Sequence, residues 1–416
     1  MDDIFYIDPE CESVKTYSDL FQDISLIVSY TPYCKSFSFY EVFKHIIHSL
    51  VLGKEIILLD ADFSNEEIVK LTGDISVTDM HESINPCVLS GFDDFKRFVE
   101  ENKKRWKITI FTSGTTGLPK KVSHSFDSIT RSVKTDKKHL DDIWGFAYNP
   151  THMAGLQVFF QAFLNHNTII RLFRLEREIF FQALKKYNFT HLSATPTFYR
   201  LLLPVEQSFN SLQRLTSGGE KFDPHTLEQL KTMFPSAKIT NVYASTEAGT
   251  LFASDGEIFR VKDELTHLVR IRQGLLFVHK RLIGLFDNQQ MEGEWYSTGD
   301  LVDIVSEDPL TFRFISRSNE MINVGGYKVN PIEIEEAIRN LDGVKDVFVY
   351  GKSNRILGGI VCCDIIKKTD SLTELKIRES LKSQLQEFKI PRVITFVDKL
   401  EITRTGKMDR KQHKEI

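Results

Sequence analysis

A run of threonine, serine and glycine residues ahead of a lysine is the feature of this sequence that most directly indicates chemistry. It lies in FTSGTTGLPKKVSHS, residues 111–125, next to the strand-like segment ITIF. Glycines permit close approach and positive φ, so such a loop can turn backbone N–H groups and hydroxyls toward a polyphosphate. The chain lacks the GxxxxGK(S/T) pattern, which argues against a P-loop phosphotransferase. We expect a phosphate loop made of Thr112, Ser113, Gly114, Thr115, Thr116 and Gly117, with Lys120 as a mobile positive charge.

Five more polar segments follow this loop along the chain. They are SGGE at 217–220, NVYASTEAG at 241–249, YSTGDL at 296–301, ISRSNEMINVGGYKVNPIEIEEAI at 315–338 and ITRTGKMDRK at 402–411. In this order, and together with the loop, they resemble the signatures of the adenylate-forming superfamily of acyl-CoA synthetases, peptide-synthetase adenylation domains and luciferases. The loop signature of that superfamily usually reads (Y/F)TSG(S/T)TGxPKG, and Lys121 replaces its last glycine here.

The resemblance implies a binding site for ATP and Mg²⁺ built from several of these segments. A lone Glu suits Mg²⁺, which keeps several waters while it bridges phosphate oxygens. A carboxylate that accepts hydrogen bonds from two ribose hydroxyls makes a strong, charge-assisted contact. The implied places are Gly218, Gly219 and Glu220 beside adenine, Tyr243 stacked on adenine, Thr246 at the α-phosphate, Glu247 on Mg²⁺, and Asp300 and Arg317 on the ribose.

The C-terminal segments imply the catalytic lysine and the second half of the reaction. Lys407 corresponds to the catalytic lysine of the superfamily, although Ile402 replaces the usual proline of that signature. Asn319 occupies the hinge position. By the resemblance, the small domain rotates about Asn319 and opens a pantetheine path near Gly325 and Gly326.

A further segment resembles the wall of the substrate pocket. YNPTHMAGLQVFF, residues 148–160, matches a pattern that often reads PxxHxxG, with His152 and Gly155 in its diagnostic places. Superfamily members that activate amino acids carry an Asp in this region to pair with the substrate ammonium. This chain offers His152, Met153 and Ala154 instead, so the sequence disfavours an α-amino acid as substrate.

Alternating helix and strand periodicities indicate what positions these segments. Residues 42–51 place apolar side chains on one helical face with Gly53 as C-cap, and EIILLD at 55–60 reads as a strand buried on both faces. The pattern repeats as helix, strand, helix and strand at residues 178–187, 190–196, 224–234 and 238–245. This alternation predicts a doubly wound sheet, which binds ligands beyond the carboxyl ends of its strands.

The last hundred residues or so predict a compact α+β domain. Asn330 and Pro331 read as the cap and first residue of a helix. Ser371 and Glu374 have the spacing of a capping box that opens a second helix. Two strand-like runs lie between these helices, and the second contains the adjacent Cys362 and Cys363, which we expect to be buried strand residues rather than metal ligands.

The predicted fold class is therefore α/β with two domains. Residues 1–317 form a large N-terminal domain with doubly wound sheets that binds ATP and the acid, and residues 318–416 form a small, mobile α+β domain on a hinge. About 110 residues precede the phosphate loop, fewer than the superfamily usually has. We therefore expect an N-terminal domain that is shortened.

Composition narrows the class of protein further. Lys and Arg total 53 against 57 Asp and Glu, a net charge of -4 that gives no support for a nucleic-acid partner. No apolar run approaches the about 18 residues of a transmembrane helix, and the N-terminus lacks the order of a signal peptide. The five cysteines form neither a disulfide framework nor a CxxC pair, which indicates a reducing compartment. We expect a soluble, cytoplasmic protein.

Together these observations predict an acid–thiol ligase of the acyl-CoA synthetase type. It would convert a small carboxylic acid and MgATP into an acyl-AMP and pyrophosphate, and then pass the acyl group to the thiol of coenzyme A. The phosphopantetheine of an acyl carrier protein is an alternative acceptor that the sequence leaves open. A non-catalytic nucleotide-binding protein on a shortened fold is an alternative of another class, and the joint presence of Glu247, Asp300, Arg317 and Lys407 argues against it.

Overall fold

The chain consists of two compact units. The computed structural model describes residues 3–112, 120–220, 224–286, 291–325, 327–354 and 358–401. The first unit comprises Met1–Gly219, Gln229–Gly256 and Val278–Tyr296, and the second comprises Glu220–Glu228, Glu257–Phe277 and Ser297–Ile416. The domain boundary between residues 317 and 318 stays a prediction. No helix in the described part of the chain is both long and apolar enough to cross a membrane.

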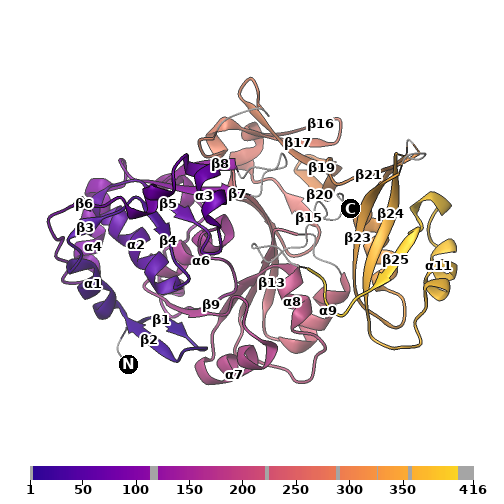
Figure 1. The fold of residues 1–416 in the computed structure, drawn as a ribbon, viewed down its shortest axis with the longest axis horizontal. Helices are drawn as coiled ribbons and strands as arrows, with labels where there is room; N and C mark the ends of the chain where they lie inside the picture. The colour runs from indigo at the N-terminus through magenta and orange to yellow at the C-terminus, as the bar shows by residue number, and fades with distance from the viewer. Residues whose placement is uncertain are drawn as a thin grey trace. The chain divides into compact units, whose positions relative to one another are not determined.

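The larger sheet of the first unit is parallel in its centre and antiparallel at its edges (Figure 1). Its order is β14 (Gly249–Ser254), β13 (Lys238–Ser245), β12 (Arg214–Gly218), β11 (His191–Ala194), β9 (Ile143–Phe146), β10 (Thr168–Arg171), β1 (Ile4–Asp8) and β2 (Ser13–Thr16). The chain passes from β9 to β10 on one side of β9 and then to β11 on the other side. The winding direction of the sheet therefore reverses at β9.

The smaller sheet of the same unit carries the strands that flank the phosphate loop. Its order is β4 (Tyr33–Lys35), β5 (Ile56–Leu59), β7 (Lys107–Thr112) and β8 (Lys120–Ser125), and a separate pair joins β3 (Ser29–Tyr30) to β6 (Glu82–Ser83). β4, β5 and β7 are parallel, and β8 runs antiparallel to β7. All of β5 is buried, as EIILLD predicts. The phosphate loop thus starts at the same edge of the sheet as the residue that follows β5.

Two apolar helices lie between these sheets. α2 (Phe39–Leu52) contacts β4 and β5 of the smaller sheet, and α6 (Met153–Phe163) contacts β9 and β10 of the larger one. The two helices meet where the rings of Phe43 and Phe159 stack at 4.5 Å between centroids, and Phe43 also meets the edge of Phe146 at 5.3 Å. Each helix packs against a sheet on one side and against the other helix on another side. Apolar side chains are therefore buried on more than one face of each helix.

Most of the next sheet, and a short hairpin that follows it in the chain, belong to the second unit. The sheet has the order β15 (Ile258–Arg260), β20 (Leu310–Arg317), β19 (Trp295–Glu307), β17 (Leu275–His279) and β16 (Val269–Arg272), with β18 (Met291–Glu292) paired to β19. The hairpin is formed by β21 (Ile322–Val324) and β22 (Tyr327–Val329). β19 and β20 are the strands that carry the predicted ribose-binding residues.

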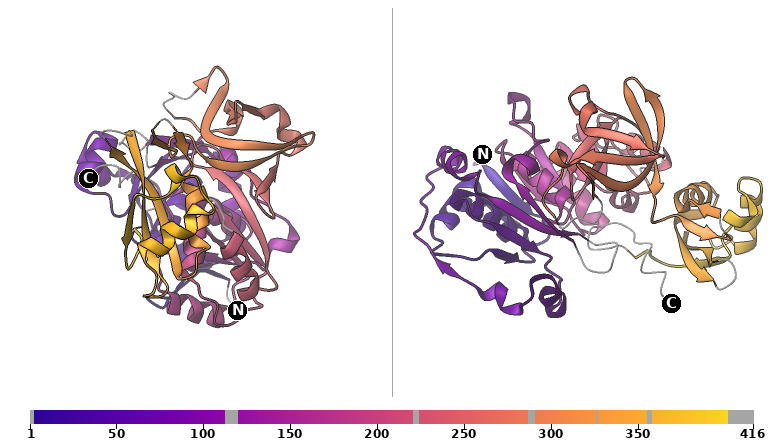
Figure 2. Two further views of the ribbon diagram at one scale, coloured as in Figure 1. Left: turned by 90° about the vertical axis from the view of Figure 1, so that its right-hand side faces the viewer. Right: turned by 90° about the horizontal axis from the view of Figure 1, so that it is seen from above.

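The C-terminal part of the second unit is a small sheet covered by two helices on one face (Figure 2). The sheet consists of β23 (Val344–Asn354), β24 (Gly358–Lys367) and β25 (Val393–Phe396), and the helices are α10 (Pro331–Arg339) and α11 (Glu374–Lys382). Ile338 of α10 and Leu381 of α11 join one apolar core with side chains of this face. Cys362 and Cys363 are buried in β24 as expected.

Most predicted elements are confirmed. α2 ends at Gly53, whose φ of 64° is left-handed, and α10 starts at Pro331 after Asn330, whose side chain accepts from a backbone N–H of the first turn. β13 has the predicted bounds, and the remaining helices include those predicted near residues 178 and 224. They are α1 (Tyr17–Ser25), α3 (Asn65–Thr72), α4 (Phe92–Asn102), α5 (Phe126–Ile129), α7 (Arg177–Tyr187), α8 (Pro196–Leu201) and α9 (Pro224–Met233).

The predicted capping box of α11 is wrong. The helix begins at Glu374 after Thr373, whose hydroxyl accepts a hydrogen bond from the Lys376 N–H. Ser371 lies too early in the chain and contacts the Thr369 hydroxyl instead. Thr373 is equally able to cap and stands directly before the first helical residue, so it takes the position.

Candidate nucleotide and acid site

Several predicted residues of the first unit gather at one edge of its larger sheet. β9, β11, β12 and β13 are parallel, so their carboxyl ends share an edge. β12 ends there at Gly218, the segment with His152 follows β9, and Thr246 and Glu247 follow β13. Open α/β sheets bind ligands at the point where the winding reverses, which here is β9. The topology therefore favours a ligand crevice beside the segment that carries His152.

A buried carboxylate joins the two sheets of this unit at that edge. Asp60 directly follows β5 and is only 5% exposed. It accepts hydrogen bonds from Asn149 Nδ2 at 3.1 Å, from His152 Nε2 at 3.0 Å and from the Thr151 hydroxyl. Donors of this number offset the cost of removing the charge from water. Asp60 thus fixes the segment that carries His152 against the edge from which the phosphate loop starts.

Gly155 is required by close packing at the start of α6. A Cβ at this position would lie 2.2 Å from the Asn149 carbonyl oxygen, which is far inside van der Waals contact. The same carbonyl accepts a hydrogen bond from the His152 N–H at 3.3 Å. The glycine therefore serves the conformation of the segment from Asn149 to His152. The predicted places of His152 and Gly155 in the wall of an acid pocket stay predictions.

The segment after β13 is held through consecutive backbone carbonyl groups. The Thr246 carbonyl accepts a hydrogen bond from His124 Nε2 at 2.8 Å, and the Glu247 carbonyl accepts one from the Gly284 N–H at 2.7 Å. The Ala248 carbonyl accepts one from the Arg131 guanidinium. His124 belongs to β8, the strand that leaves the phosphate loop. The structure therefore ties the Thr246–Glu247 segment directly to the exit of that loop.

Burial sets the protonation state of the His124 ring. The residue is 2% exposed, and burial lowers the pKa of its imidazole, while the hydrogen bond to the Thr246 carbonyl opposes that shift. A carbonyl only accepts, so the proton of the neutral ring lies on Nε2. Nδ1 is then the acceptor for the Ser128 hydroxyl at 3.0 Å. Both ring nitrogens have hydrogen-bond partners, so the ring holds β8 and the Thr246–Glu247 segment at a fixed separation.

The Glu247 side chain fits the predicted role of a Mg²⁺ ligand. Its main chain is fixed by the Gly284 N–H, and the residue is half-buried. Its carboxylate makes no hydrogen bond or ion pair within the part of the chain that the structure describes. Mg²⁺ is usually held by one or two carboxylates and several waters, which an unengaged carboxylate on a rigid backbone can provide.

Most of the predicted phosphate loop lies outside the described residues. This applies to Ser113, Gly114, Thr115, Thr116 and Gly117. The flanking strands are described, and Thr112 at the end of β7 pairs with Lys120 at the start of β8. Lys120 is half-buried. The roles of all these residues toward phosphate stay predictions.

The predicted adenine contacts lie at the ends of two neighbouring parallel strands. Gly219 has a left-handed φ of 85°, which favours glycine, and a Cβ at Gly218 would lie 3.1 Å from the Val242 carbonyl oxygen. Tyr243 is 9% exposed, and its ring packs on Phe252 at 5.5 Å between centroids. Glu220 follows Gly219 and is half-buried. The adenine-binding roles themselves stay predictions.

In the second unit, the two predicted ribose ligands are direct neighbours. Asp300 and Arg317 lie opposite each other on β19 and β20, and Arg317 Nε is 3.1 Å from Asp300 Oδ1. The Asp300 side chain is 4% exposed and that of Arg317 is 48% exposed. An oriented carboxylate next to a surface guanidinium suits the recognition of vicinal hydroxyls. Their role toward ribose stays a prediction.

The predicted hinge residue stands at a boundary between elements. Asn319 is exposed and lies between the end of β20 and the start of β21, in a turn in which the Glu320 N–H donates to the Arg317 carbonyl at 3.0 Å. Gly325 of the β21–β22 hairpin has a left-handed φ of 58°. Gly326 and Lys407 lie outside the described residues.

Three supporting residues escaped the sequence analysis. Asp60 carried a usable signal, because a carboxylate directly after a wholly buried strand lies at the ligand-binding edge of a parallel sheet. His124 lies inside the segment FTSGTTGLPKKVSHS, but nothing in one sequence distinguishes it from a structural histidine. Arg131 belongs to none of the sequence motifs, so no pattern indicated its role.

Comparisons with known proteins identify families and relatives that resemble this chain. A sequence model described as "AMP-binding enzyme" matches residues 39–278, and one described as "AMP-binding enzyme C-terminal domain" matches residues 333–407. The mitochondrial acyl-coenzyme A synthetase ACSM4 of Homo sapiens is 26% identical over 358 residues, which cover 75% of this chain and 61% of that protein. A 2-succinylbenzoate–CoA ligase of Staphylococcus epidermidis is 24% identical over 413 residues, which cover 89% of this chain and 85% of the relative.

The fold is also that of solved members of this group. ATP-bound MatB from Rhodopseudomonas palustris superimposes with a TM-score of 0.76, covering 99% of this chain and 96% of the other at 18% identity. The predicted mixed α/β fold with a small C-terminal sheet domain is thereby confirmed. With one family model matching more than half of the chain and its C-terminal companion following in order, the chain belongs to the AMP-binding enzyme family.

Proposed function

We propose that this protein is an AMP-forming acid–thiol ligase. It would couple a small carboxylic acid to ATP with release of pyrophosphate, and then transfer the acyl group to the pantetheine thiol of coenzyme A. The observation that carries the proposal is the hydrogen bond from His124 to the Thr246 carbonyl, which ties the exit of the phosphate loop to the proposed Mg²⁺ ligand segment. The adjacent Glu247 carboxylate is half-buried and makes no hydrogen bond or ion pair within the described residues, so it is available to a metal ion.

In the first half-reaction, the substrate carboxylate attacks the α-phosphorus in line and pyrophosphate leaves. Such a reaction depends mainly on positioning and on groups that stabilise charge where it develops. Mg²⁺ bound by Glu247 would supply positive charge at the phosphate oxygens. Thr246 would donate its hydroxyl to the α-phosphate, and Lys407 would approach the same region with a mobile ammonium group. The fixed carbonyls of residues 246–248 limit how far this segment can drift.

Two sets of residues would orient the nucleoside. Gly218, Gly219 and Tyr243 would surround adenine, and Asp300 would accept hydrogen bonds from the ribose hydroxyls. Arg317 orients the Asp300 carboxylate through its contact at 3.1 Å. A carboxylate that is already oriented loses little entropy when ribose binds, so the pair would contribute to ATP affinity more than a flexible surface acid does.

The acid would bind beside the segment that carries His152. The Asp60 carboxylate contacts this segment, and its oxygens accept hydrogen bonds from Asn149, Thr151 and His152. An α-ammonium group would therefore compete with these donors for a buried acceptor. This supports a carboxylic acid without an α-amino group as the substrate class.

The second half-reaction would need a change in the position of the small domain. Lys407 would have to leave before a thiol could reach the acyl-AMP, and a pivot at an element boundary would absorb the change in φ/ψ. Asn319 is exposed and lies in the turn between β20 and β21, at such a boundary. The thiol would then approach along the hairpin that contains Gly325.

Coenzyme A is the acceptor that the relatives favour. Their names describe coenzyme A synthetases and ligases, and they cover most of this chain at 24–26% identity. A carrier-protein phosphopantetheine presents the same thiol on the same arm, so it remains the alternative acceptor. The two are separated by the assay below.

The proposed function is tested by the products of ATP consumption across a panel of carboxylic acids. AMP and pyrophosphate should appear only when both Mg²⁺ and a suitable acid are present, and an acyl thioester should follow on addition of coenzyme A. ADP and inorganic phosphate as the main products would contradict the proposal. Tight ATP binding without turnover for any acid would favour the non-catalytic alternative, and thioester formation only with a loaded carrier protein would change the acceptor.

A further inference from the structure

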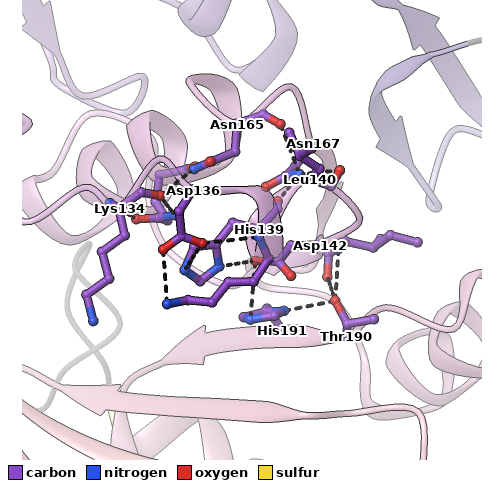
Figure 3. Close-up of polar contacts among 12 residues, drawn as sticks. Lys134, Asp136, His139, Leu140, Asp142, Asn165, Asn167, Thr190 and His191 are labelled. Carbon is purple, nitrogen blue, oxygen red and sulfur yellow. Dashed lines mark hydrogen bonds and ion pairs between the residues drawn. The ribbon is translucent and has the colours of Figure 1, made fainter.

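A group of buried imidazole and carboxylate side chains, drawn in Figure 3, lies at the amino ends of β9 and β11 in the larger sheet. His139 ends a short 3₁₀ helix (Lys137–His139), Asp142 precedes β9, and His191 is the first residue of β11. His139 Nδ1 is 2.9 Å and His191 Nε2 is 3.5 Å from the same oxygen, Asp142 Oδ2. These residues sit at the amino ends of parallel strands, whereas the nucleotide and acid would bind at the carboxyl ends. The cluster therefore belongs to a different site.

The cluster has donor atoms that the protein itself does not satisfy. His191 is 3% exposed, Asp142 and His139 are 8% exposed, and the Nε2 atoms of both imidazoles are buried without a hydrogen-bond partner among the described residues. His191 Nε2 lies 3.5 Å from Asp142 Oδ2, and a cation held between the imidazoles and this carboxylate would give the unpartnered nitrogen a ligand role.

We propose that His139, Asp142 and His191 bind a divalent transition-metal ion, with Zn²⁺ as the best match. Two imidazoles and one carboxylate form the ligand set that zinc takes when a water completes the tetrahedron. One donor atom from each residue lies within 4.8 Å of the others. Ligands of one zinc ion lie roughly 3.3 Å apart at Zn–N distances of about 2.0–2.1 Å. The carboxylate contacts are close to this spacing, and the two imidazoles would approach each other by at most roughly 1.5 Å.

His191 has the outer partner that a metal-bound histidine requires, and His139 has a carboxylate near its other ring nitrogen but beyond hydrogen-bond distance. A ligating histidine usually donates its other ring N–H to an oxygen, which fixes its tautomer. His191 Nδ1 lies 2.9 Å from the Thr190 hydroxyl, and His139 Nε2 lies 3.9 Å from Asp136 Oδ1. Binding of the metal through His139 Nδ1 would leave Nε2 on the side of the Asp136 carboxylate.

The role that this position supports is structural. The metal would join the helix before β9 to the first residue of β11, and these strands pair in register as His191 opposite Trp144. The ring of Trp144 also packs on that of His191 at 4.7 Å between centroids. A metal here would fix the amino ends of the two strands whose carboxyl ends flank the proposed acid site. This inference goes beyond the proposed ligase function and does not depend on it.

The proposal is tested with Zn²⁺ alone on the full-length protein in excess Mg²⁺, which occupies the proposed site at Glu247. After dialysis against a chelator, calorimetric titration should give one Zn²⁺ per chain, and Zn²⁺ should raise Tm. His191→Gln should weaken this binding at least tenfold and abolish the rise in Tm. His267→Gln is the matched control, because His267 is an exposed histidine of the second unit, and it should leave both results unchanged.

Two outcomes would overturn the proposal. Wild-type protein that binds no Zn²⁺ in this titration would show a metal-free His–Asp–His hydrogen-bond network, and unchanged binding in His191→Gln would place the metal elsewhere. Should His191→Gln fail to fold, the absorption spectrum of Co²⁺-loaded wild-type protein decides instead. A four-coordinate band that disappears in Asp142→Asn supports the site, and a six-coordinate spectrum unaffected by Asp142→Asn refutes it.

Discussion

A single methyl group at Gly284 tests whether the support beneath Thr246 and Glu247 matters for catalysis. The Gly284 N–H donates to the Glu247 carbonyl at 2.7 Å. A Cβ on Gly284 would lie 2.6 Å from His124 Cε1 and 2.7 Å from the Ser123 carbonyl oxygen, whereas ordinary contact starts at 3.4 Å. Gly284→Ala must therefore move the atoms apart by 0.7–0.8 Å.

The displacement should fall on the residues that hold the catalytic segment. Ser123 belongs to β8 and is fixed by pairing with β7, so the chain around Gly284 must yield and loosen its bond to Glu247. Overpacking of this kind costs about 1–3 kcal/mol of stability. Misplacement of a catalytic group by about 1 Å reduces a rate by about 10²-fold. We expect kcat for pyrophosphate release to fall by roughly 10–10²-fold and the Mg²⁺ requirement to rise.

The assay is acid-dependent pyrophosphate release as a function of Mg²⁺, with folding checked by circular dichroism and urea unfolding. Gly256→Ala is the control, because nothing lies within 4 Å of a Cβ at that position, and it should leave both quantities near wild type. A folded Gly284→Ala protein with wild-type kcat and Mg²⁺ dependence would refute the reasoning. It would show that the hydrogen bonds to residues 246–248 serve stability alone.

Three further predictions concern other parts of the molecule. Asp300→Ala removes the proposed ribose acceptor, a loss of about 1.5–3 kcal/mol, so the KM for ATP should rise roughly 10–10²-fold in steady-state kinetics. Asp60→Asn replaces one accepting oxygen by a donating amide that faces the donors of Thr151 and His152, so the segment beside the proposed acid site should shift. The KM for the acid should rise, and the KM for ATP should stay nearly unchanged. Burial lowers the pKa of His48 from 6.5 to about 4, so the unfolded chain binds more protons between these values. Stability should therefore fall as pH drops from 6.5 toward 4, by up to about 3 kcal/mol, and His48→Leu should remove this part of the dependence in urea unfolding.

Each of these predictions has an outcome that contradicts it. A folded Asp300→Ala protein with an unchanged KM for ATP would mean that Asp300 serves the strand pair alone. Equal changes in both KM values for Asp60→Asn would point to a general loss of structure. Stability curves for wild type and His48→Leu that stay parallel between pH 7 and pH 4 would show that other groups titrate in this range.

Local sequence patterns were sufficient for the elements that carry the site. β5 and β13 were predictable because short apolar runs between helical segments have few other ways to bury their side chains. Helix ends were predictable at Gly53, Asn330 and Pro331, because these residue types favour helix termini for local reasons. Such preferences depend only on the few neighbouring residues. The same local logic failed at Ser371, where Thr373 offered an equivalent hydroxyl nearer to the helix.

Contacts between distant segments could not be predicted from one sequence. Asp60 and His152 are 92 positions apart, and His124 and Thr246 are 122 positions apart. Their proximity depends on how two sheets meet around α2 and α6, which no local periodicity encodes. The cluster of His139, Asp142 and His191 was missed for the same reason, since its ligand spacing exists only after β9 and β11 have paired.

The most direct test of the account follows the oxygen atoms of the substrate. The protein is incubated with ATP, Mg²⁺ and a carboxylic acid labelled with heavy oxygen in its carboxylate, followed by coenzyme A, and the products are analysed by mass spectrometry. Attack of the carboxylate on the α-phosphorus predicts one labelled oxygen in AMP and unlabelled pyrophosphate. Label in inorganic phosphate with ADP as the other product, or AMP without label, would contradict formation of an acyl-AMP and with it the central claim.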